Sequence, residues 1–232
     1  MTKKYQHIFF DLDETLWDFH SNSREALQEI AVTYNFSEKG IPTLESFLEV
    51  YFPINEKMWD LFRNGVVDMN GLRYKRFEET FNLFNINDSK FIAEIANAYT
   101  TVAPQKTNLI PYAKEVLERL SQKYTLHIIT NGFEEVQQIK IKNCNLLPYF
   151  KTITSSEKSG YKKPDARMFN YALQQANALP QNSIMIGDSL EADILGAKAF
   201  GMDQVYFNPS AKAHKYSITQ EIVSLKELLV WL

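Results

Sequence analysis

The sequence predicts an α/β fold, a doubly wound parallel sheet with helices on both faces, interrupted by an inserted four-helix segment. After residue 104, short apolar segments typical of buried strands alternate with helical segments. One similar strand, residues 8–10, lies near the N-terminus, and residues 22–102 show only helical periodicity. We therefore expect one α/β domain from residues 1–17 and 104–232, with an inserted helical domain over residues 18–103.

The breaks between the expected elements fall at clusters of turn-forming residues. In the insert, Asn22 and Glu25 indicate a capped helix start. Further helices are expected at 43–62, 72–84 and 89–101. In the α/β domain we expect strands at 125–130, 151–154, 183–187 and 204–207, and helices at 112–122, 134–143, 165–178, 190–200 and 225–231.

Composition excludes several classes of protein. The 25 basic and 28 acidic residues give a net charge of −3, which provides no overall electrostatic attraction for polymeric nucleic acid. The single cysteine, Cys144, cannot form an internal disulfide, as is usual in a reducing compartment. No segment is apolar for long enough to be a signal peptide or a membrane span. We expect a cytoplasmic protein without a membrane partner.

Three of the predicted strands end in reactive polar residues. The first runs into Asp11 and Asp13, another into Thr130-Asn131-Gly132, and a third into Asp188. Ligands bind at the carboxyl ends of the strands in an open parallel sheet. The three ends are therefore expected to meet at one edge, although an Asp-x-Asp pair or an Asn-Gly turn by itself is also common in ordinary turns.

The residue types at this edge favour a cation and an anion together. Asp11, Asp13 and Asp188 form a cluster of hard oxygen ligands suited to Mg²⁺, which would relieve their mutual repulsion. In Lys162-Lys163-Pro164, the proline favours an extended residue before it, so that a lysine can reach an anion at the edge. The alternative for this lysine is a solvated loop position.

The fragment Gly187-Asp188-Ser189-Leu190 matches the signature of GDSL-type esterases, whose serine is a nucleophile. Those enzymes also need a downstream Asp-x-x-His. The one later histidine, His214, is preceded at that spacing by Ala211, so a serine hydrolase is not expected.

Four motifs in order resemble the haloacid dehalogenase superfamily over nearly the whole chain. They are Asp11-Leu12-Asp13-Glu14-Thr15-Leu16, Thr130-Asn131-Gly132, Lys163-Pro164-Asp165 and the run from Gly187 to Asp193. The helical insert occupies the position of that family's C1 cap. More narrowly, residues 11–19 and Thr130-Asn131-Gly132-Phe133 look like those of the YjjG-type pyrimidine 5′-nucleotidases.

The resemblance implies phosphatase chemistry through an aspartyl-phosphate. Asp11 would be the nucleophile, and Asp13 would protonate the leaving oxygen and then deprotonate the attacking water. Asp13 argues against a dehalogenase, which has no leaving phosphate oxygen to protonate and needs no Mg²⁺. A phosphomutase shares every motif. A phosphonatase would need a cap lysine, and a degenerate binding module is disfavoured by the intact motifs.

The resemblance also implies two sets of binding residues. The phosphoryl oxygens would be held by Thr130, the backbone N–H of Asn131 and Lys163, with Lys162 as the alternative lysine. Mg²⁺ would bind a carboxylate oxygen of Asp11, the main-chain carbonyl of Asp13 and a carboxylate oxygen of Asp188, and Asp193 would support these ligands.

The expected substrate is a small phosphorylated metabolite, favoured to be a pyrimidine nucleoside monophosphate. Trp17 and Phe19, just past the nucleophile, are candidates for stacking on a base or sugar. Phosphoglycolate and sugar phosphates are the alternatives.

Overall fold

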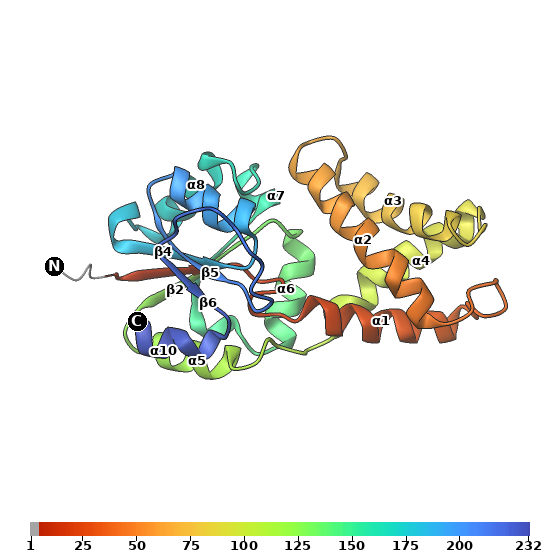
Figure 1. Cartoon of the computed structure of the whole chain (residues 1–232), viewed down its shortest axis with the longest axis horizontal. Helices are drawn as coiled ribbons and strands as arrows, with labels where there is room; N and C mark the ends of the chain where they lie inside the picture. Colours follow the sequence, from red (N-terminus) through yellow and green to blue (C-terminus); the bar gives the residue numbers. More distant parts are fainter. Residues whose placement is uncertain (1–4) are drawn as a thin grey trace. The chain divides into compact units, whose positions relative to one another are not determined.

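The computed structural model describes residues 5–232, which form two compact units (Figure 1). Residues 5–19 and Thr107–Leu232 form an α/β unit, and His20–Lys106 form a helical unit. Among residues 5–232, no helix is both long and apolar enough to cross a bilayer. The division into a catalytic core and a cap, and the cytoplasmic location, stay predictions.

The α/β unit is built on a six-stranded sheet whose strands are all parallel, which confirms the predicted fold class. The strand order is β3-β2-β1-β4-β5-β6. Strand β6 was not predicted; it has only three residues. The bounds are β1 His7–Phe10, β2 Thr125–Thr130, β3 Phe150–Ser155, β4 Ser183–Gly187, β5 Asp203–Phe207 and β6 Gln220–Ile222.

Helices cover both faces of this sheet because successive strand residues point to opposite sides. Ile8 and Phe10 belong to a core that includes α5 (Ala113–Leu120), α6 (Glu134–Asn143) and α10 (Leu228–Trp231). Phe9 belongs to a second core with α8 (Ala166–Ala176) and α9 (Gly196–Ala199). The remaining short elements of this unit are α7 (Ser156–Ser159), 3₁₀ turns at Leu147–Tyr149, Pro180–Asn182 and Leu225–Glu227, and a π-helical turn at Leu190–Leu195. A further 3₁₀ turn, Ala103–Gln105, belongs to the helical unit.

The helical unit contains α1 (Phe19–Thr33), α2 (Leu44–Arg63), α3 (Met69–Asn82) and α4 (Ser89–Val102). Their apolar faces form a core rich in phenylalanine and tyrosine. Thr43, Asp68 and Asp88 cap the last three helices by accepting backbone N–H hydrogen bonds. The expected cap at Asn22 is wrong: α1 begins at Phe19, and Asn22 is buried inside it.

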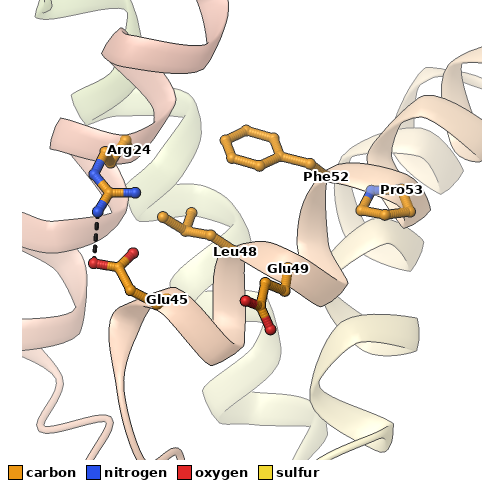
Figure 2. A pocket seen from close by; sticks show the side chains of 6 residues that line it. All are labelled: Arg24, Glu45, Leu48, Glu49, Phe52 and Pro53. Atoms are coloured by element: carbon orange, nitrogen blue, oxygen red, sulfur yellow. Dashed lines mark hydrogen bonds and ion pairs between the residues drawn. The ribbon is translucent and has the colours of Figure 1, made fainter.

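An open pocket of about 600 Å³ lies on the helical unit (Figure 2). An ion pair of 2.5 Å between Arg24 of α1 and Glu45 of α2 lies at its edge. Both side chains are exposed, so the pair contributes little stability. The other lining residues are Leu48, Glu49, Phe52 and Pro53.

Two histidines lie side by side in the sheet of the α/β unit. His7 Nδ1 and His127 Nε2 are 3.1 Å apart, and His127 Nδ1 is 2.8 Å from Thr152 Oγ1. The His127 ring is buried and stacks on Phe9, with ring centroids 4.5 Å apart. Burial, with a smaller contribution from the charge of His7, lowers the pKa of His127 to about 3. His127 is therefore neutral in the folded protein at physiological pH.

This buried histidine predicts a loss of stability in mild acid. The folded-state pKa of His127 lies below the ordinary value of about 6.5, so the unfolded chain takes up the proton first and stability falls as pH drops below 6.5. Between pH 7 and pH 5 the loss from His127 is about 2 kcal/mol. The free energy of unfolding, measured by urea denaturation at each pH, should fall less steeply between pH 7 and pH 5 in His127→Gln than in the wild type. The exposed-site control, His20→Gln, should keep the pH dependence of the wild type. An equal pH dependence in both variants would contradict the assignment.

Candidate active site

Three adjacent strands of the sheet end in polar residues at the same edge. Strand β1 lies between β2 and β4 and runs parallel to both. Asp11 follows β1, Thr130 ends β2, and Asp188 follows β4. The N–H of Asp11 donates to Ile186 O at 2.9 Å, which continues the ladder between β1 and β4. The structure thus brings Asp11, Thr130 and Asp188 to one place, as parallel pairing requires.

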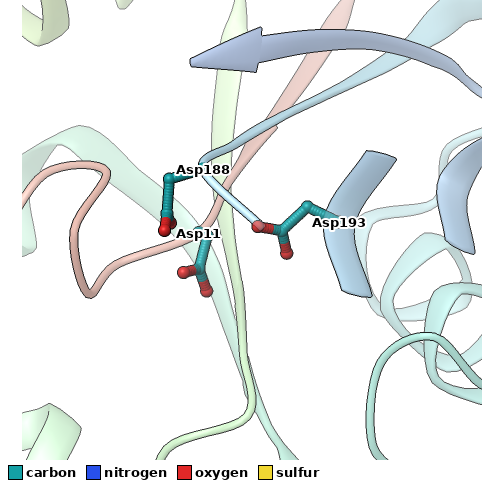
Figure 3. A group of neighbouring side chains, drawn as sticks. All are labelled: Asp11, Asp188 and Asp193. Atoms are coloured by element: carbon teal, nitrogen blue, oxygen red, sulfur yellow. The ribbon is translucent and has the colours of Figure 1, made fainter. Parts of the chain in front are cut away.

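Three carboxylates gather at this edge (Figure 3). Asp11, Asp188 and Asp193 each offer an oxygen, and these oxygens lie within 4.8 Å of one another. Burial raises the pKa of Asp11 to about 7; the charge of Lys163 opposes this rise, and that of Asp193 adds to it. Burial also raises the pKa of Asp188 well above its usual range, and the charges of Asp11 and Asp193 act in the same direction. The cluster therefore resists carrying its full negative charge.

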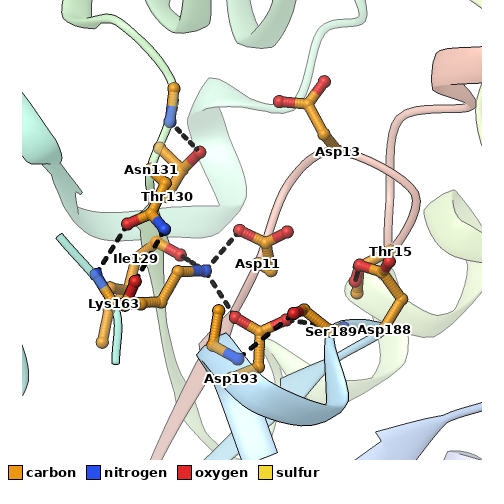
Figure 4. Close-up of polar contacts among 12 residues, drawn as sticks. Asp11, Asp13, Thr15, Ile129, Thr130, Asn131, Lys163, Asp188, Ser189 and Asp193 are labelled. Atoms are coloured by element: carbon orange, nitrogen blue, oxygen red, sulfur yellow. Dashed lines mark hydrogen bonds and ion pairs between the residues drawn. The ribbon is translucent and has the colours of Figure 1, made fainter. Parts of the chain in front are cut away.

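Lys163 is the cation inside this cluster (Figure 4). Its Nζ donates to Asp11 Oδ1 at 2.6 Å, to Asp193 Oδ1 at 2.6 Å and to Ile129 O at 2.8 Å, which uses all three ammonium protons. The side chain is 2% exposed. Burial alone would lower the pKa of Lys163, but Asp11 and Asp193 outweigh it and raise the pKa. The lysine at Asp11 is thus Lys163 rather than its neighbour Lys162.

Asn131 fixes the backbone of Lys163. Asn131 Oδ1 accepts from the Lys163 N–H at 2.7 Å, and Asn131 Nδ2 donates to Lys163 O at 3.0 Å (Figure 4). Its own carbonyl accepts from Ser156 Oγ at 3.0 Å. The Lys163-Pro164 peptide bond is cis. The sequence had suggested a use only for the backbone N–H of Asn131, and the amide side chain proves to be a positioning group for Lys163.

Thr130 has its hydroxyl oxygen already occupied as an acceptor. Thr130 Oγ1 accepts from the Gly132 N–H at 3.0 Å and from Gln137 Nε2 at 2.7 Å. A hydroxyl has two acceptor lone pairs and one proton. Both lone pairs are used, so the hydroxyl proton is left for donation to another group at the strand end.

Both carboxylate oxygens of Asp193 accept hydrogen bonds from neighbouring groups. Oδ1 accepts from Lys163 Nζ, and Oδ2 accepts from the Ser189 N–H at 3.0 Å. A Cβ on Gly187 would lie 2.2 Å from Asp193 Oδ2, so only glycine allows this close approach. Ser189 itself caps the π-helical turn, accepting from the Ala192 N–H at 3.2 Å, a structural role that gives no support to a nucleophilic serine.

The Asp13 carboxylate is held by side chains outside the aspartate cluster. Oδ2 accepts from Gln137 Nε2 at 2.7 Å, and Oδ1 accepts from Lys140 Nζ at 2.6 Å. Neither partner was predicted from the sequence. The one available signal was their spacing, since Gln137 and Lys140 stand three residues apart on α6 and share its buried face with Ile141.

The cluster has the donor chemistry for a hard divalent cation. Its ligand atoms are carboxylate oxygens, with no thiolate or imidazole in the group. Three aspartates against the single charge of Lys163 leave an excess of about two negative charges when all are ionised. A divalent cation would offset that excess and favour the ionised carboxylates. Asp11 and Asp188 are the fitting ligands, because Asp193 is engaged by Lys163 and Ser189.

Comparison with known proteins agrees with the fold. A family model described as haloacid dehalogenase-like hydrolase matches residues 5–201. The pyrimidine 5′-nucleotidase YjjG of Escherichia coli is 32% identical over 228 residues, covering 97% of this chain and 96% of the relative. The pyrimidine 5′-nucleotidase PynA of Streptococcus pneumoniae is 30% identical over 230 residues, covering 97% and 94%.

The HAD-hydrolase YfnB of Bacillus subtilis is similar in both sequence and structure. It is 30% identical over 232 residues, covering 97% of this chain and 94% of the relative. Its crystal structure, described as bound to magnesium and as revealing interdomain movement, superposes with a TM-score of 0.88 and covers 99% of each chain.

The parallel sheet with its strand-end aspartates and buried lysine defines an enzyme of the hydrolase class. More narrowly, the chain belongs to the haloacid dehalogenase-like hydrolases, which confirms the resemblance drawn from the four sequence motifs.

Proposed function

We propose that the protein hydrolyses phosphate monoesters through an aspartyl-phosphate on Asp11, with Mg²⁺ as its cation and pyrimidine nucleoside 5′-monophosphates as its substrates. The observation that carries the proposal is the contact of Lys163 Nζ with Asp11 Oδ1 beside Asp188. An ammonium group and a cation site next to a carboxylate suit a dianionic phosphate, which three aspartates alone would repel.

In the first step, a carboxylate oxygen of Asp11 attacks the phosphorus. The new bond joins the Asp11 oxygen to phosphorus, and the bond from phosphorus to the ester oxygen breaks. Asp13 gives a proton to the departing oxygen, which leaves as the alcohol of the nucleoside. The phosphoryl group is then held on Asp11, and Asp13 is ionised.

In the second step, water attacks the phosphorus of the aspartyl-phosphate. Asp13 takes one proton of the water, the bond between phosphorus and Asp11 breaks, and phosphate is released. Both aspartates return to their starting states, so the net reaction is ester plus water to alcohol plus phosphate. One residue serves in turn as acid and as base because it faces the leaving oxygen and the incoming water in the same place.

The equatorial phosphoryl oxygens would be bound by the Thr130 hydroxyl, the backbone N–H of Asn131 and Lys163, whose ammonium would exchange its hydrogen bond with Asp11 for one with a phosphoryl oxygen. The orientation of Thr130 supports its role, because both lone pairs of its hydroxyl are used and its proton is left to donate. Preorganised donors of this kind stabilise the transition state without reorganising during reaction. Asn131 would contribute a second time through its side chain, which fixes Lys163.

Mg²⁺ would bind Asp11, Asp188 and the main-chain carbonyl of Asp13, with Asp193 in support. When bound, the ion would neutralise charge on the transferring phosphoryl group. Asp188 is already oriented by Thr15 Oγ1, which donates to its Oδ1 at 3.0 Å. The magnesium-bound relative supports this choice of ion.

The second acid separates this proposal from dehalogenation, because attack on carbon leaves no phosphate oxygen to protonate. A phosphomutase would use the same residues, with a second substrate hydroxyl in place of water. Phosphatases of phosphoglycolate or sugar phosphates remain the alternative within hydrolysis. The nucleotidase assignment is supported by the two relatives named as pyrimidine 5′-nucleotidases.

Selection of the base is assigned to the helical unit acting as a cap, and not to Trp17. The Trp17 ring is 1% exposed and packs in the core of the α/β unit, with Lys140 Nζ 4.0 Å from its centroid. The expected stacking of Trp17 on a substrate base is therefore wrong, whereas Phe19 is only partly buried. A cap that closes over the substrate would exclude bulk water and let remote contacts raise turnover.

The substrate assignment predicts a specificity pattern. With purified protein and Mg²⁺, kcat/KM for dUMP and dTMP should exceed those for phosphoglycolate, a hexose phosphate and a purine monophosphate. Asp11→Asn should abolish turnover of all of them without unfolding the protein. A tenfold preference for phosphoglycolate or the sugar phosphate, about 1.4 kcal/mol of transition-state binding, would contradict the nucleotidase assignment. Conversion of a hexose phosphate to its isomer without phosphate release would show a mutase.

The cation site predicts stabilisation by Mg²⁺ that is independent of activity. At a free concentration one hundred times its Kd, the ion should add about 2.7 kcal/mol to the free energy of unfolding and raise Tm, and EDTA should reverse both. Asp188→Asn should remove most of this shift, because it deletes a charged ligand. The exposed neighbour Glu191→Gln is the matched control and should keep it. An undiminished shift in Asp188→Asn would exclude the proposed site.

A further inference from the structure

The Asp13 carboxylate is fixed at both oxygens by two side chains from one helix. Gln137 Nε2 lies 2.7 Å from Oδ2, and Lys140 Nζ lies 2.6 Å from Oδ1. Both partners belong to α6, where a spacing of three residues places them on the same face. Rotation of the carboxylate away from this position would break at least one of the two hydrogen bonds.

Lys140 is buried where a lysine ordinarily extends to water. It is 7% exposed, and its only carboxylate contact within residues 5–232 is with Asp13. Its ammonium also lies 4.0 Å from the centroid of the Trp17 ring, a cation–π geometry. Lys142, two residues further along α6, is exposed. Burying an ammonium costs several kcal/mol that one ion pair does not reliably recover, so stability alone is a weak reason for this placement.

Burying the Gln137 side chain also costs free energy of folding. It is 1% exposed, and its two amide protons go to Asp13 Oδ2 and Thr130 Oγ1. Its Oε1 is buried and has no hydrogen-bond partner in the described part of the chain. A buried acceptor left in this way costs about 1–3 kcal/mol. The role of the Gln137 side chain is therefore to donate its two hydrogen bonds.

Gly132 is the residue that lets Gln137 reach both acceptors. A Cβ at position 132 would lie 1.9 Å from Gln137 Nε2 and 2.5 Å from its Cδ. The glycine of Thr130-Asn131-Gly132 thus has a use beyond the turn itself. Through Gln137, the group proposed to bind phosphate and the group proposed to transfer protons are joined by one amide.

From these contacts, we infer that Gln137 and Lys140 are positioning residues that hold Asp13 in place for proton transfer to the leaving oxygen. The inference rests on the proposed phosphatase function. Lys140 and Gln137 act through Asp13, and the proton that leaves with the ester oxygen still comes from the Asp13 carboxyl group.

Leaving-group dependence distinguishes positioning of an acid from general structural support. Departure of a nucleoside 5′-oxygen needs a proton, whereas p-nitrophenolate leaves readily without one. The ratio kcat/KM reports only the steps up to loss of the leaving group. It therefore isolates the acid role of Asp13 from its later role as base.

Lys140→Met and Gln137→Leu should lower kcat/KM for dUMP by roughly 10- to 100-fold, a part of the 10²–10⁴ that general acid catalysis supplies. For p-nitrophenyl phosphate the loss in Lys140→Met should stay within about threefold, whereas Gln137→Leu also removes the contact with Thr130 and should lower activity toward both esters. The controls Lys142→Met and Gln138→Leu, on the same helix, should match the wild type with both substrates. Lys140→Arg, which keeps the charge, should recover most of the lost activity toward dUMP.

The same comparison in an Asp13→Asn background provides a second measurement. Once the acid is gone, adding Lys140→Met should cost little further activity toward dUMP, because the two residues act as one unit. Equal losses of Lys140→Met with both substrates, an additive loss in the double variant, or an undiminished rate in Lys140→Met would each overturn the positioning role. A wild-type protein inactive toward both esters would instead overturn the proposed phosphatase function.

Discussion

The arrangement at the carboxyl edge of the sheet depends on one buried ammonium group, that of Lys163 between Asp11 and Asp193. Its contacts of 2.6 Å with each carboxylate offset part of a repulsion that burial intensifies. Ion pairs buried in this way seldom stabilise a protein more than apolar packing would. A site that keeps Asp11, Asp193 and Lys163 out of water is therefore better explained by its chemistry than by its contribution to folding.

Strand pairing in the sheet determines which side chains lie at the site, and local hydrogen bonds and a glycine determine the distances between them. Parallel pairing of β1 with β2 and β4 brings three strand ends together. Asn131 then fixes the backbone of Lys163 through two hydrogen bonds, and the absence of a side chain at Gly187 leaves room for Asp193. Each of these groups acts on Lys163 or on its partner, so the position of the ammonium is specified from several sides.

The sequence predicted the strand ends well because buried parallel strands are short apolar runs followed at once by polar residues. Lys163 was predicted because a proline follows it. Contacts between distant segments leave no such local pattern, and for that reason Gln137 and Lys140 were not recognised as the partners of Asp13. Trp17 was misassigned for a related reason. The sequence does not show whether an aromatic side chain near a nucleophile lines a cleft or packs in the core, and that of Trp17 packs in the core.

In the proposed reaction, Asp11 carries the phosphoryl group during turnover. The most direct measurement is rapid acid quenching of the wild-type protein turning over a nucleoside monophosphate, followed by peptide mass spectrometry. We expect one added phosphoryl group on the peptide that contains Asp11, bound through an acyl phosphate that is lost in base. A phosphoryl group on a serine or histidine, or turnover at the full rate by Asp11→Asn, would contradict it.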